Sequence, residues 1–343
     1  MIILGIESTA HTFGVGIITD KGDTGRAEGS AVQQNPWGSV RILANAKDMY
    51  KTPEGGMIPN EVVKHHLEVK ERVLNEALQQ AKLTLNDIGL ISFSRGPGLT
   101  SNILKVGKEM AVKLANGIPL VGVNHSMAHL TIGDLIAKTK DPIYLYVSGP
   151  NTQVIAYAGG RMRIFGETLD NGLGNVLDRF AREAGLGFPG GPKIEELAKK
   201  SVNYIELPYS VKGMDVSFAG MLTKAQKLLK DGAKVEDLCF SLQETAFAML
   251  VEVTERALAH CEKNEVLLIG GVAANKRLCE MLDKMCKARN ATFHPVPLQY
   301  CGDQGVMIAW QGYLEHKHGG KMVNNNIDIL PYERVDEIPV TWR

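Results

Sequence analysis

Two stretches of the sequence repeat the same order of predicted elements, and this repeat is the strongest constraint on the fold. Each stretch opens with three short runs of β-forming residues separated by Gly, Ser, Thr, Asn or Pro, which predicts an antiparallel meander. The runs are 2–7, 13–18 and 41–46 in the first stretch and 143–147, 153–157 and 161–165 in the second.

The segments that follow the two meanders also correspond. A helix is predicted over 60–83, with Asn60 as its N-cap and an apolar stripe, and a strand over 88–93 then enters the glycine turn 95–98. After the second meander several helices, the longest over 238–261, precede a strand at 265–269 and the turn Gly270-Gly271. We therefore predict an internal duplication: two α/β domains of similar topology that face each other across a cleft.

Composition narrows the class of protein. The 343 residues include 38 Lys+Arg and 38 Asp+Glu, and a net charge of zero argues against a free-standing nucleic-acid binder. The five cysteines are odd in number and form no C-x-x-C pair, so reduced thiols are expected. The N-terminus lacks the features of a signal peptide and no apolar run approaches a membrane span, which predicts a cytoplasmic protein. Residues 21–40 are predicted to be a surface loop.

The most specific chemical signal is a pair of histidines. His125 and His129 follow a predicted strand at 119–123, and Asn124 is a suitable N-cap for a helix that runs to Ile136. Four-residue spacing places both imidazoles on one helical face, which is the arrangement of two neutral nitrogens on one metal. Two ordinary histidines remain the alternative. The H-E-x-x-H pattern of zinc peptidases is absent, which makes a peptidase the weakest hypothesis.

Asp303 is the candidate oxygen ligand. It precedes a predicted helix at 306–314, so an N-cap role is the alternative. Two histidines and one carboxylate with open positions suit Fe(II) or Zn(II) rather than Mg²⁺.

Three glycine turns form a second signal. They lie at 147–153, 190–193 and 270–275, where backbone N–H groups and helix N-termini can hold phosphate oxygens. Glycine is common in turns for other reasons, so each turn alone says little. Neither a P-loop nor a G-x-G-x-x-G motif is present.

Together these residues resemble the universal tRNA threonylcarbamoyladenosine transferase family, in particular the catalytic subunit of the archaeal and eukaryotic KEOPS complex. The resemblance covers residues 5–12, 94–99, 123–125 with 129, 145–149, 165–170, 187–192, 212–215 and 270–275. It implies the duplicated actin-like, sugar-kinase-like (ribonuclease H-like) α/β fold with a central cleft. We place the first domain at 1–135 plus 318–343 and the second at 136–317.

The resemblance also implies a metal-dependent activity. The family transfers threonylcarbamoyl from its adenylate to N6 of the adenosine 3′ of the anticodon. The resemblance implies that His125, His129 and Asp303 bind one divalent metal, Fe(II) or Zn(II), which Tyr146 can approach. It also implies that an ATP/AMP-type nucleotide or the threonylcarbamoyl-adenylate is bound by Tyr146, Val147, Ser148, Gly149, Pro150, Asp178, Gly191, Glu195 and Asn275. The implied partners are tRNA and the other KEOPS subunits, an atypical protein kinase and small accessory proteins.

The sequence departs from the family pattern at several positions. Pro150 replaces a glycine and so removes a backbone donor, Gln304 replaces an asparagine, Ala219 a serine and Arg95 a glutamine. A non-catalytic nucleotide-binding scaffold of the same complex is therefore one alternative. A small-molecule kinase of the same fold is another, although it has no evident use for His125 and His129.

Overall fold

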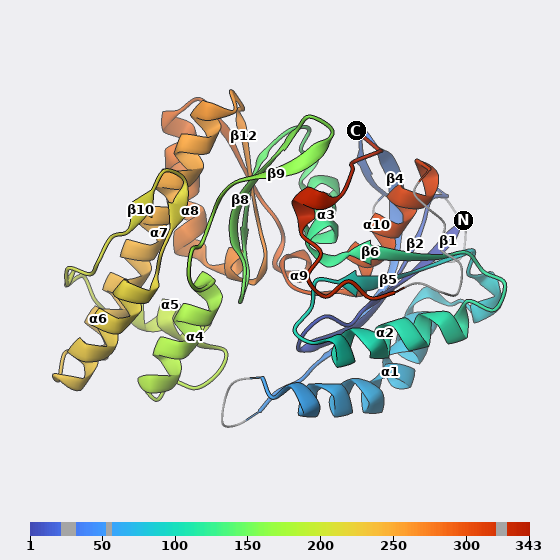
Figure 1. Ribbon diagram of the computed structural model, residues 1–343, viewed down its shortest axis with the longest axis horizontal. Coiled ribbons are helices and arrows are strands. Elements are labelled where there is room, and N and C mark those ends of the chain that lie inside the picture. Colours follow the sequence, from blue (N-terminus) through green and yellow to red (C-terminus); the bar gives the residue numbers. More distant parts are fainter. Residues whose placement is uncertain (22–31, 53–56, 320–327) are drawn as a thin grey trace.

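Two mixed β-sheets organise the computed structural model, which describes residues 1–21, 32–52, 57–319 and 328–343 (Figure 1). The first sheet has the order β3-β4-β2-β1-β5-β6 and the second β13-β12-β7-β8-β9. The strands of the first are β1 (Ile2–Glu7), β2 (Thr12–Thr19), β3 (Val32–Asn35), β4 (Gly38–Met49), β5 (Leu90–Gly96) and β6 (Leu120–Asn124). Those of the second are β7 (Ile143–Val147), β8 (Thr152–Ala158), β9 (Arg161–Glu167), β12 (Glu265–Ile269) and β13 (Thr292–Pro295).

The two sheets share one connectivity. In the first, β1 pairs antiparallel with β2, β2 pairs antiparallel with β4, and β5 and β6 continue the sheet in parallel from β1. In the second, β7 pairs antiparallel with β8, β8 pairs antiparallel with β9, and β12 and β13 continue in parallel from β7. The predicted duplication and both meanders are therefore confirmed.

Helices cover the sheets and lie between them (Figure 1). The first half contributes α1 (Pro59–Ala81), α2 (Ser101–Leu114) and α3 (His125–Ala137). The second contributes α4 (Leu173–Glu183), α5 (Gly190–Ala198), α6 (Ala219–Lys230), α7 (Val235–His260), α8 (Lys276–Ala288), α9 (Leu298–Cys301) and α10 (Gly305–Lys317). A short hairpin, β10 (Val211–Lys212) with β11 (Asp215–Val216), precedes α6 in sequence. Helix α10 contacts β1, β2 and β5 of the first sheet, although it follows the second sheet in sequence.

Two local predictions were wrong. Helix α1 begins one residue earlier than predicted: Ile58 is its N-cap and Pro59 occupies the first turn, so Asn60 does not cap it. Part of the predicted loop at 21–40 is strand β3, which forms a hairpin with β4 through the turn after Asn35. The Asn35 side chain accepts hydrogen bonds from the backbone N–H groups of Trp37 and Gly38, a turn signal that the prediction overlooked. Residues 38–40 of the predicted loop belong to β4, and residues 22–31 lie outside the described residues.

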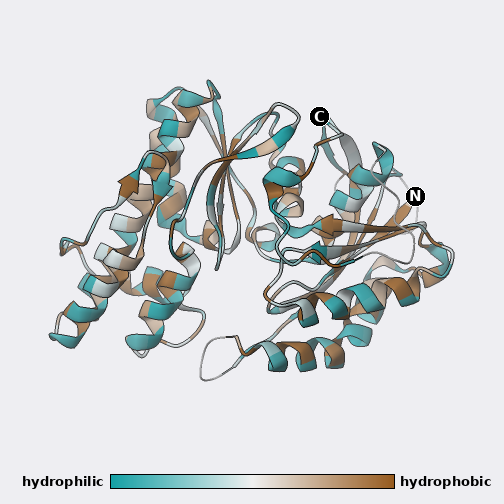
Figure 2. Ribbon diagram, in the orientation of Figure 1, coloured by the Kyte–Doolittle hydropathy of each residue, from teal (hydrophilic) through white to brown (hydrophobic). Residues whose placement is uncertain are grey.

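Apolar residues concentrate in the central strands and on the inner faces of the helices (Figure 2). Helices α3 and α10 are buried almost throughout, as expected for helices that are covered by protein on several sides. The five cysteines are all free thiols, as predicted. In the part of the chain that the structure describes, none of the helices has the length and apolar character to cross a membrane. The division into 1–135 plus 318–343 and 136–317 stays a prediction.

Small residues let α10 lie directly on the first sheet. Gly5 and Gly16 are paired across β1 and β2, and a Cβ at either position would lie 2.2 Å from Ala309 N or 2.1 Å from Val306 N. These are backbone atoms, which cannot move aside as a side-chain end can. The first turn of α10 is thereby held against β2, and this contact fixes the chain just after Asp303.

We expect Gly16→Ala to lower the free energy of unfolding by about 1–3 kcal/mol, because the added methyl overpacks this contact. Gly220→Ala in α6 is the matched control, since its Cβ would meet only Pro208 at 3.8 Å. That control should be neutral or slightly stabilising, because Ala favours helix over Gly. Urea unfolding of the two variants measures the difference, and equal stabilities would contradict the packing argument.

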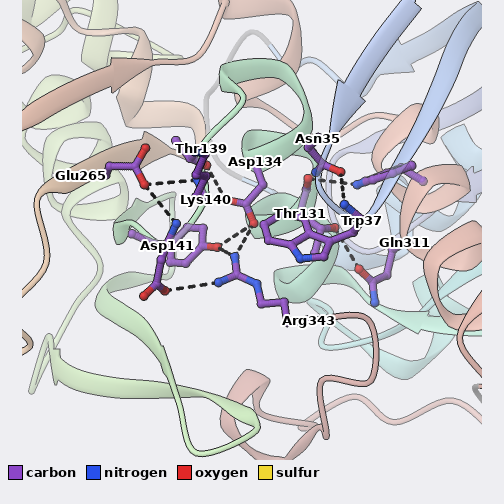
Figure 3. A network of polar contacts seen from close by, with 12 residues as sticks. Asn35, Trp37, Thr131, Asp134, Thr139, Lys140, Asp141, Glu265, Gln311 and Arg343 are labelled. Carbon is purple, nitrogen blue, oxygen red and sulfur yellow. Dashed lines mark hydrogen bonds and ion pairs between the residues drawn. The ribbon is translucent and has the colours of Figure 1, made fainter.

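A buried polar network ties α3 to strand β7 and to helix α10 (Figure 3). The Asp134 carboxylate accepts hydrogen bonds from Tyr144 Oη at 2.6 Å, Thr139 Oγ1 at 2.6 Å and Arg343 Nη2 at 2.7 Å. The Arg343 guanidinium lies 4.4 Å from the ring centre of Trp37. The helix that carries the two histidines is therefore fixed at its C-terminal end by groups from β7 and the C-terminal segment.

Candidate metal centre

The two histidines lie at the start of α3. Strand β6 ends at Asn124, whose side chain accepts a hydrogen bond from Met127 N at 3.0 Å and so caps the helix as predicted. The imidazole rings of His125 and His129 are 4.7 Å apart between centroids, at an interplanar angle of 85°. Both side chains are at least nine-tenths buried. The four-residue spacing does place both rings on one face.

Asp303 meets the histidines from the other half of the chain. Its Oδ1 lies 3.2 Å from His129 Nε2 and 3.6 Å from His125 Nε2. Helix α10 begins after Gln304, and no side chain caps it, so Asp303 does not take the alternative N-cap role. One potential ligand atom from each of the three residues lies within 4.8 Å of the other two.

The pKa values of the two imidazoles shift in opposite directions. Burial alone would lower the pKa of His125, but the negative charges of Glu7 and Asp303 raise it to about 9. Burial lowers the pKa of His129, and the neighbouring His125 lowers it further. Burial alone would raise the pKa of Asp303, but the hydrogen bond from His129 and the positive charge of His125 hold it below its usual range.

The donor set fits one borderline divalent cation. Two imidazole nitrogens and a carboxylate oxygen converge from two helical regions, and this combination suits Fe(II) or Zn(II). His125 Nδ1 lies 3.0 Å from Glu7 Oε2, so its opposite nitrogen, Nε2, is the one that faces Asp303. An outer carboxylate on the far nitrogen is the usual companion of a metal-bound histidine. These three residues are therefore a candidate site for one metal ion.

Tyr146 and the turn that follows it lie beside this centre. The Tyr146 ring centroid is 5.3 Å from that of His129, and burial, followed by the charge of Asp303, raises the pKa of its phenol. Val147 ends β7, and a Cβ added to Gly270 would lie 2.3 Å from the Val147 carbonyl oxygen. Gly270 also has φ +102°, so this position requires glycine. The structure thus brings Tyr146 next to the three candidate ligands.

The turn from Ser148 to Asn151 is closed by its own hydrogen bonds. Ser148 N donates to Asn151 O at 2.8 Å, and Asn151 N donates to Ser148 Oγ at 3.2 Å. The carbonyls of Ser148 and Gly149 accept from the first amides of α4. Pro150 has no N–H, so Gly149 N–H is the remaining donor of this turn among the described residues.

Asp178 and Gly191 meet where α4 packs against α5. The Asp178 carboxylate accepts a hydrogen bond from Gly190 N at 2.7 Å, and burial raises its pKa. Asp178 also lines a cleft of about 220 Å³ with Met57, Asn175, Arg179, Arg182, Gly187 and Phe188. This cleft lies between the segment before α1 and the start of the second half's helices.

Glu195 and Asn275 meet at the start of α8. Glu195 Oε1 accepts from Lys276 N at 3.3 Å, and Asn275 caps α8 by accepting from Arg277 N at 2.9 Å. The Asn275 amide group donates to Gln243 Oε1 at 2.9 Å. The residues predicted to hold the nucleotide therefore form three local groups around α4, α5 and α8, and one of those groups, the turn after Tyr146, adjoins the metal centre.

The sequence prediction missed Glu7, Thr9 and Lys47. Glu7 and Thr9 contact His125, and Lys47 Nζ lies 3.5 Å from the Asp303 carbonyl oxygen. A lone acidic residue at the end of an apolar strand was the available signal for Glu7. Two departures also have local partners: Arg95 forms an ion pair with Glu333, and Asn45 Nδ2 donates to Gln304 Oε1 at 3.2 Å.

Comparison with known proteins identifies the family. The model of the family described as tRNA N6-adenosine threonylcarbamoyltransferase matches residues 41–310. Relatives of that name from Thermococcus sibiricus and Archaeoglobus fulgidus are 48% and 47% identical to this chain, with full coverage of both chains in each case. A "Probable bifunctional tRNA threonylcarbamoyladenosine biosynthesis protein" from Methanothermobacter thermautotrophicus is 49% identical over the whole of this chain. The chain spans 61% of the length of that bifunctional relative.

Solved structures are similar in fold at much lower identity. HypF from T. kodakarensis has a TM-score of 0.61 at 16% identity, over 92% of this chain and 48% of its own. The activator of 2-hydroxyisocaproyl-CoA dehydratase from Clostridium difficile, with bound ADPNP, has a TM-score of 0.54 at 14% identity, over 96% of this chain and 100% of its own. These likenesses agree with the predicted actin-like, sugar-kinase-like fold. With a family model over most of its length and full-length relatives at nearly half identity, this chain belongs to the tRNA N6-adenosine threonylcarbamoyltransferase family.

Proposed function

We propose that this chain catalyses transfer of threonylcarbamoyl from its adenylate to N6 of the adenosine 3′ of the tRNA anticodon. The observation that carries the proposal is the convergence of His125, His129 and Asp303 beside Tyr146, on a chain of this family. A small-molecule kinase of the same fold would have no use for this histidine pair.

Each residue of the centre has a proposed role. His125 and His129 offer nitrogens, and Asp303 offers an oxygen, to one divalent ion, Fe(II) or Zn(II). When bound, the metal supplies Lewis acidity toward a carbonyl or phosphate oxygen of the acyl-adenylate. Burial of the centre excludes water, which competes with the adenosine amine for the acyl group.

The nucleotide part of the adenylate, or an ATP/AMP-type nucleotide, is proposed to lie along the groups around α4, α5 and α8. The proposed residues are Tyr146, Val147, Ser148, Gly149, Pro150, Asp178, Gly191, Glu195 and Asn275. Gly149 N–H and the N-terminal amides of α5 are suitable donors to phosphate oxygens. A departing phosphate stabilised in this way makes the acyl group easier to transfer to a weak amine nucleophile.

The chain is proposed to act in the cytoplasm together with the other KEOPS subunits, the atypical protein kinase and the small accessory proteins. The zero net charge of the chain supports this arrangement, because a polyanionic tRNA is bound mainly through basic groups, which the partner subunits would supply.

The test is a transfer assay with the chain, the partner subunits, threonylcarbamoyl-adenylate and tRNA. We expect threonylcarbamoyl on the adenosine 3′ of the anticodon, detected by nucleoside mass spectrometry. A tRNA with guanosine at that position is the control and should remain unmodified. Absence of product from the wild-type complex, with intact adenylate at the end of the reaction, would contradict the proposal.

A substitution of Pro150 distinguishes the enzyme hypothesis from the hypothesis of a non-catalytic scaffold. Pro150 is exposed, and the turn around it is already closed by hydrogen bonds of its neighbours. We expect Pro150→Gly to reduce the free energy of unfolding by about 0.4–1 kcal/mol, because glycine gives the unfolded chain more conformations. Turnover should stay within about threefold, since one additional exposed donor contributes about 0.5 kcal/mol at the low end of hydrogen-bond values. A gain above tenfold in the transfer assay would favour the non-catalytic scaffold.

A further inference from the structure

Glu7 is a buried carboxylate that the proposed reaction leaves without a role. Its side chain is 0% exposed, and it lies at the last position of β1, in the middle of the first sheet. Among the described residues its one cationic partner is His125, with Glu7 Oε2 3.0 Å from His125 Nδ1. Since an unpaired buried charge is costly, this contact accounts for the presence of Glu7 in the core.

The other Glu7 oxygen is held by the turn after β1. Glu7 Oε1 accepts a hydrogen bond from Thr9 N at 2.8 Å and another from Thr9 Oγ1. Thr9 Oγ1 also lies 3.2 Å from His125 Nδ1. The carboxylate therefore has a fixed orientation, and both groups that contact Nδ1 are themselves tied together.

The turn after Glu7 is held by hydrogen bonds to two other elements. Ser8 N donates to Ser94 Oγ at 3.0 Å, and Ser8 Oγ donates to the Ile103 carbonyl at 2.9 Å, which anchors the turn to β5 and α2. A ligand-orienting group needs such support, because a loosely held group cannot define the angle of the ring that it contacts.

The chemistry of the contact fixes the tautomer of His125. An ionised carboxylate only accepts hydrogen bonds, so His125 Nδ1 carries the proton and donates it. In a neutral ring the lone pair is then on Nε2, the nitrogen that lies 3.6 Å from Asp303 Oδ1. His129 differs, because its Nδ1 is buried without a hydrogen-bond partner in the described part of the chain.

We propose that Glu7 is a positioning residue of the metal centre, which holds His125 in the tautomer and orientation that direct Nε2 toward the metal. The proposal rests on the metal site of the proposed function, but it concerns the affinity for the metal rather than the transfer reaction. Outer carboxylates of this kind typically change metal affinity by about 10–100-fold when they are removed.

The experiment measures Zn²⁺ affinity by competition with a chromogenic chelator, on the full chain and without substrate. Glu7→Ala is expected to weaken Zn²⁺ binding by about 10–100-fold. Glu7→Gln keeps the shape and one acceptor but removes the charge, so its loss should be smaller. Asp134→Asn is the matched control. It neutralises another fully buried carboxylate, whose hydrogen bonds are to residues other than the three candidate ligands. Its affinity should match that of the wild type, although its unfolding midpoint falls.

A second measurement reports on the ring itself. In Zn²⁺-loaded protein labelled with ¹⁵N-histidine, long-range ¹H–¹⁵N correlations should show His125 protonated at Nδ1 in the wild type and in Glu7→Gln. The proposal is overturned if both Glu7 variants bind Zn²⁺ within about threefold of the wild type. It is also overturned if Asp134→Asn loses as much affinity as Glu7→Ala, since the effect would then be one of general stability. Failure of the metal site itself gives a different result: the wild type and His125→Ala would bind Zn²⁺ equally.

Discussion

The Asp303→Ala variant is expected to lose its bound divalent metal and to transfer threonylcarbamoyl roughly 10²–10³-fold more slowly than the wild type. Among the described residues, Asp303 is the carboxylate that lies close to both His125 Nε2 and His129 Nε2, at 3.6 and 3.2 Å. A Lewis-acid metal contributes several kcal/mol of transition-state stabilisation, and each 1.4 kcal/mol is about tenfold in rate. Elemental analysis after gel filtration gives the metal content, and single-turnover assays with saturating adenylate give the rate.

The control for this variant is Asp283→Ala. Asp283 is a half-exposed aspartate on α8 that pairs with Lys287 one turn away, so its loss should leave the metal content unchanged and the rate within about twofold. The doubly substituted His125→Ala, His129→Ala protein should resemble Asp303→Ala. Full transfer activity in that metal-free double variant would contradict the mechanism, whereas it would leave the fold unaffected.

The Arg343→Ala variant is expected to lose about 3–5 kcal/mol of unfolding free energy, the second large effect. Both partners of the Arg343–Asp134 ion pair are buried, with side chains 5% and 0% exposed. Burial alone would lower the pKa of the Arg343 guanidinium, but its interactions with Tyr144 and Asp134 raise it, so the net shift is upward. Removal of one partner leaves an uncompensated charge in the interior, which costs more than the pair itself contributes.

Urea unfolding at fixed pH measures this loss. Arg289→Ala is the matched control, because Arg289 and its partner Glu255 are largely exposed and such pairs contribute about 1 kcal/mol or less. Asp134 would still accept hydrogen bonds from Tyr144 and Thr139, so the site should not rearrange completely. A loss for Arg343→Ala no larger than that for Arg289→Ala would show that the pair is not a structural anchor of α3.

The repeat in the sequence was sufficient to predict the duplicated α/β architecture because its signals are local. Three β-forming runs, a helix, a strand and a glycine turn each depend on neighbouring residues, and the two copies support each other. The N-cap of α3 and the facing histidines were predictable for the same reason, since Asn124, His125 and His129 lie within six residues. The errors at α1 and β3 arose where two turn signals competed, Pro59 against Asn60 and Asn35 against the surrounding glycines.

The contacts that complete the site are long-range, and periodicity carries no information about them. Asp303 meets His129 across 174 residues, and its role came from the family resemblance and from residue type rather than from spacing. Glu7 meets His125 across 118 residues and Arg343 meets Asp134 across 209, and neither pairing was predicted. The sequence does not show which charged residues are buried or which distant residues pair with them. These contacts are known only from the folded structure.

The most direct test of this account is anomalous diffraction at the zinc edge from crystals of the Zn²⁺-loaded chain. We predict one strong peak, which marks a zinc ion at about 2.0–2.2 Å from Nε2 of His125, Nε2 of His129 and a carboxylate oxygen of Asp303. A peak elsewhere, or an unoccupied cluster in protein that contains stoichiometric zinc, would contradict the assignment of the metal centre.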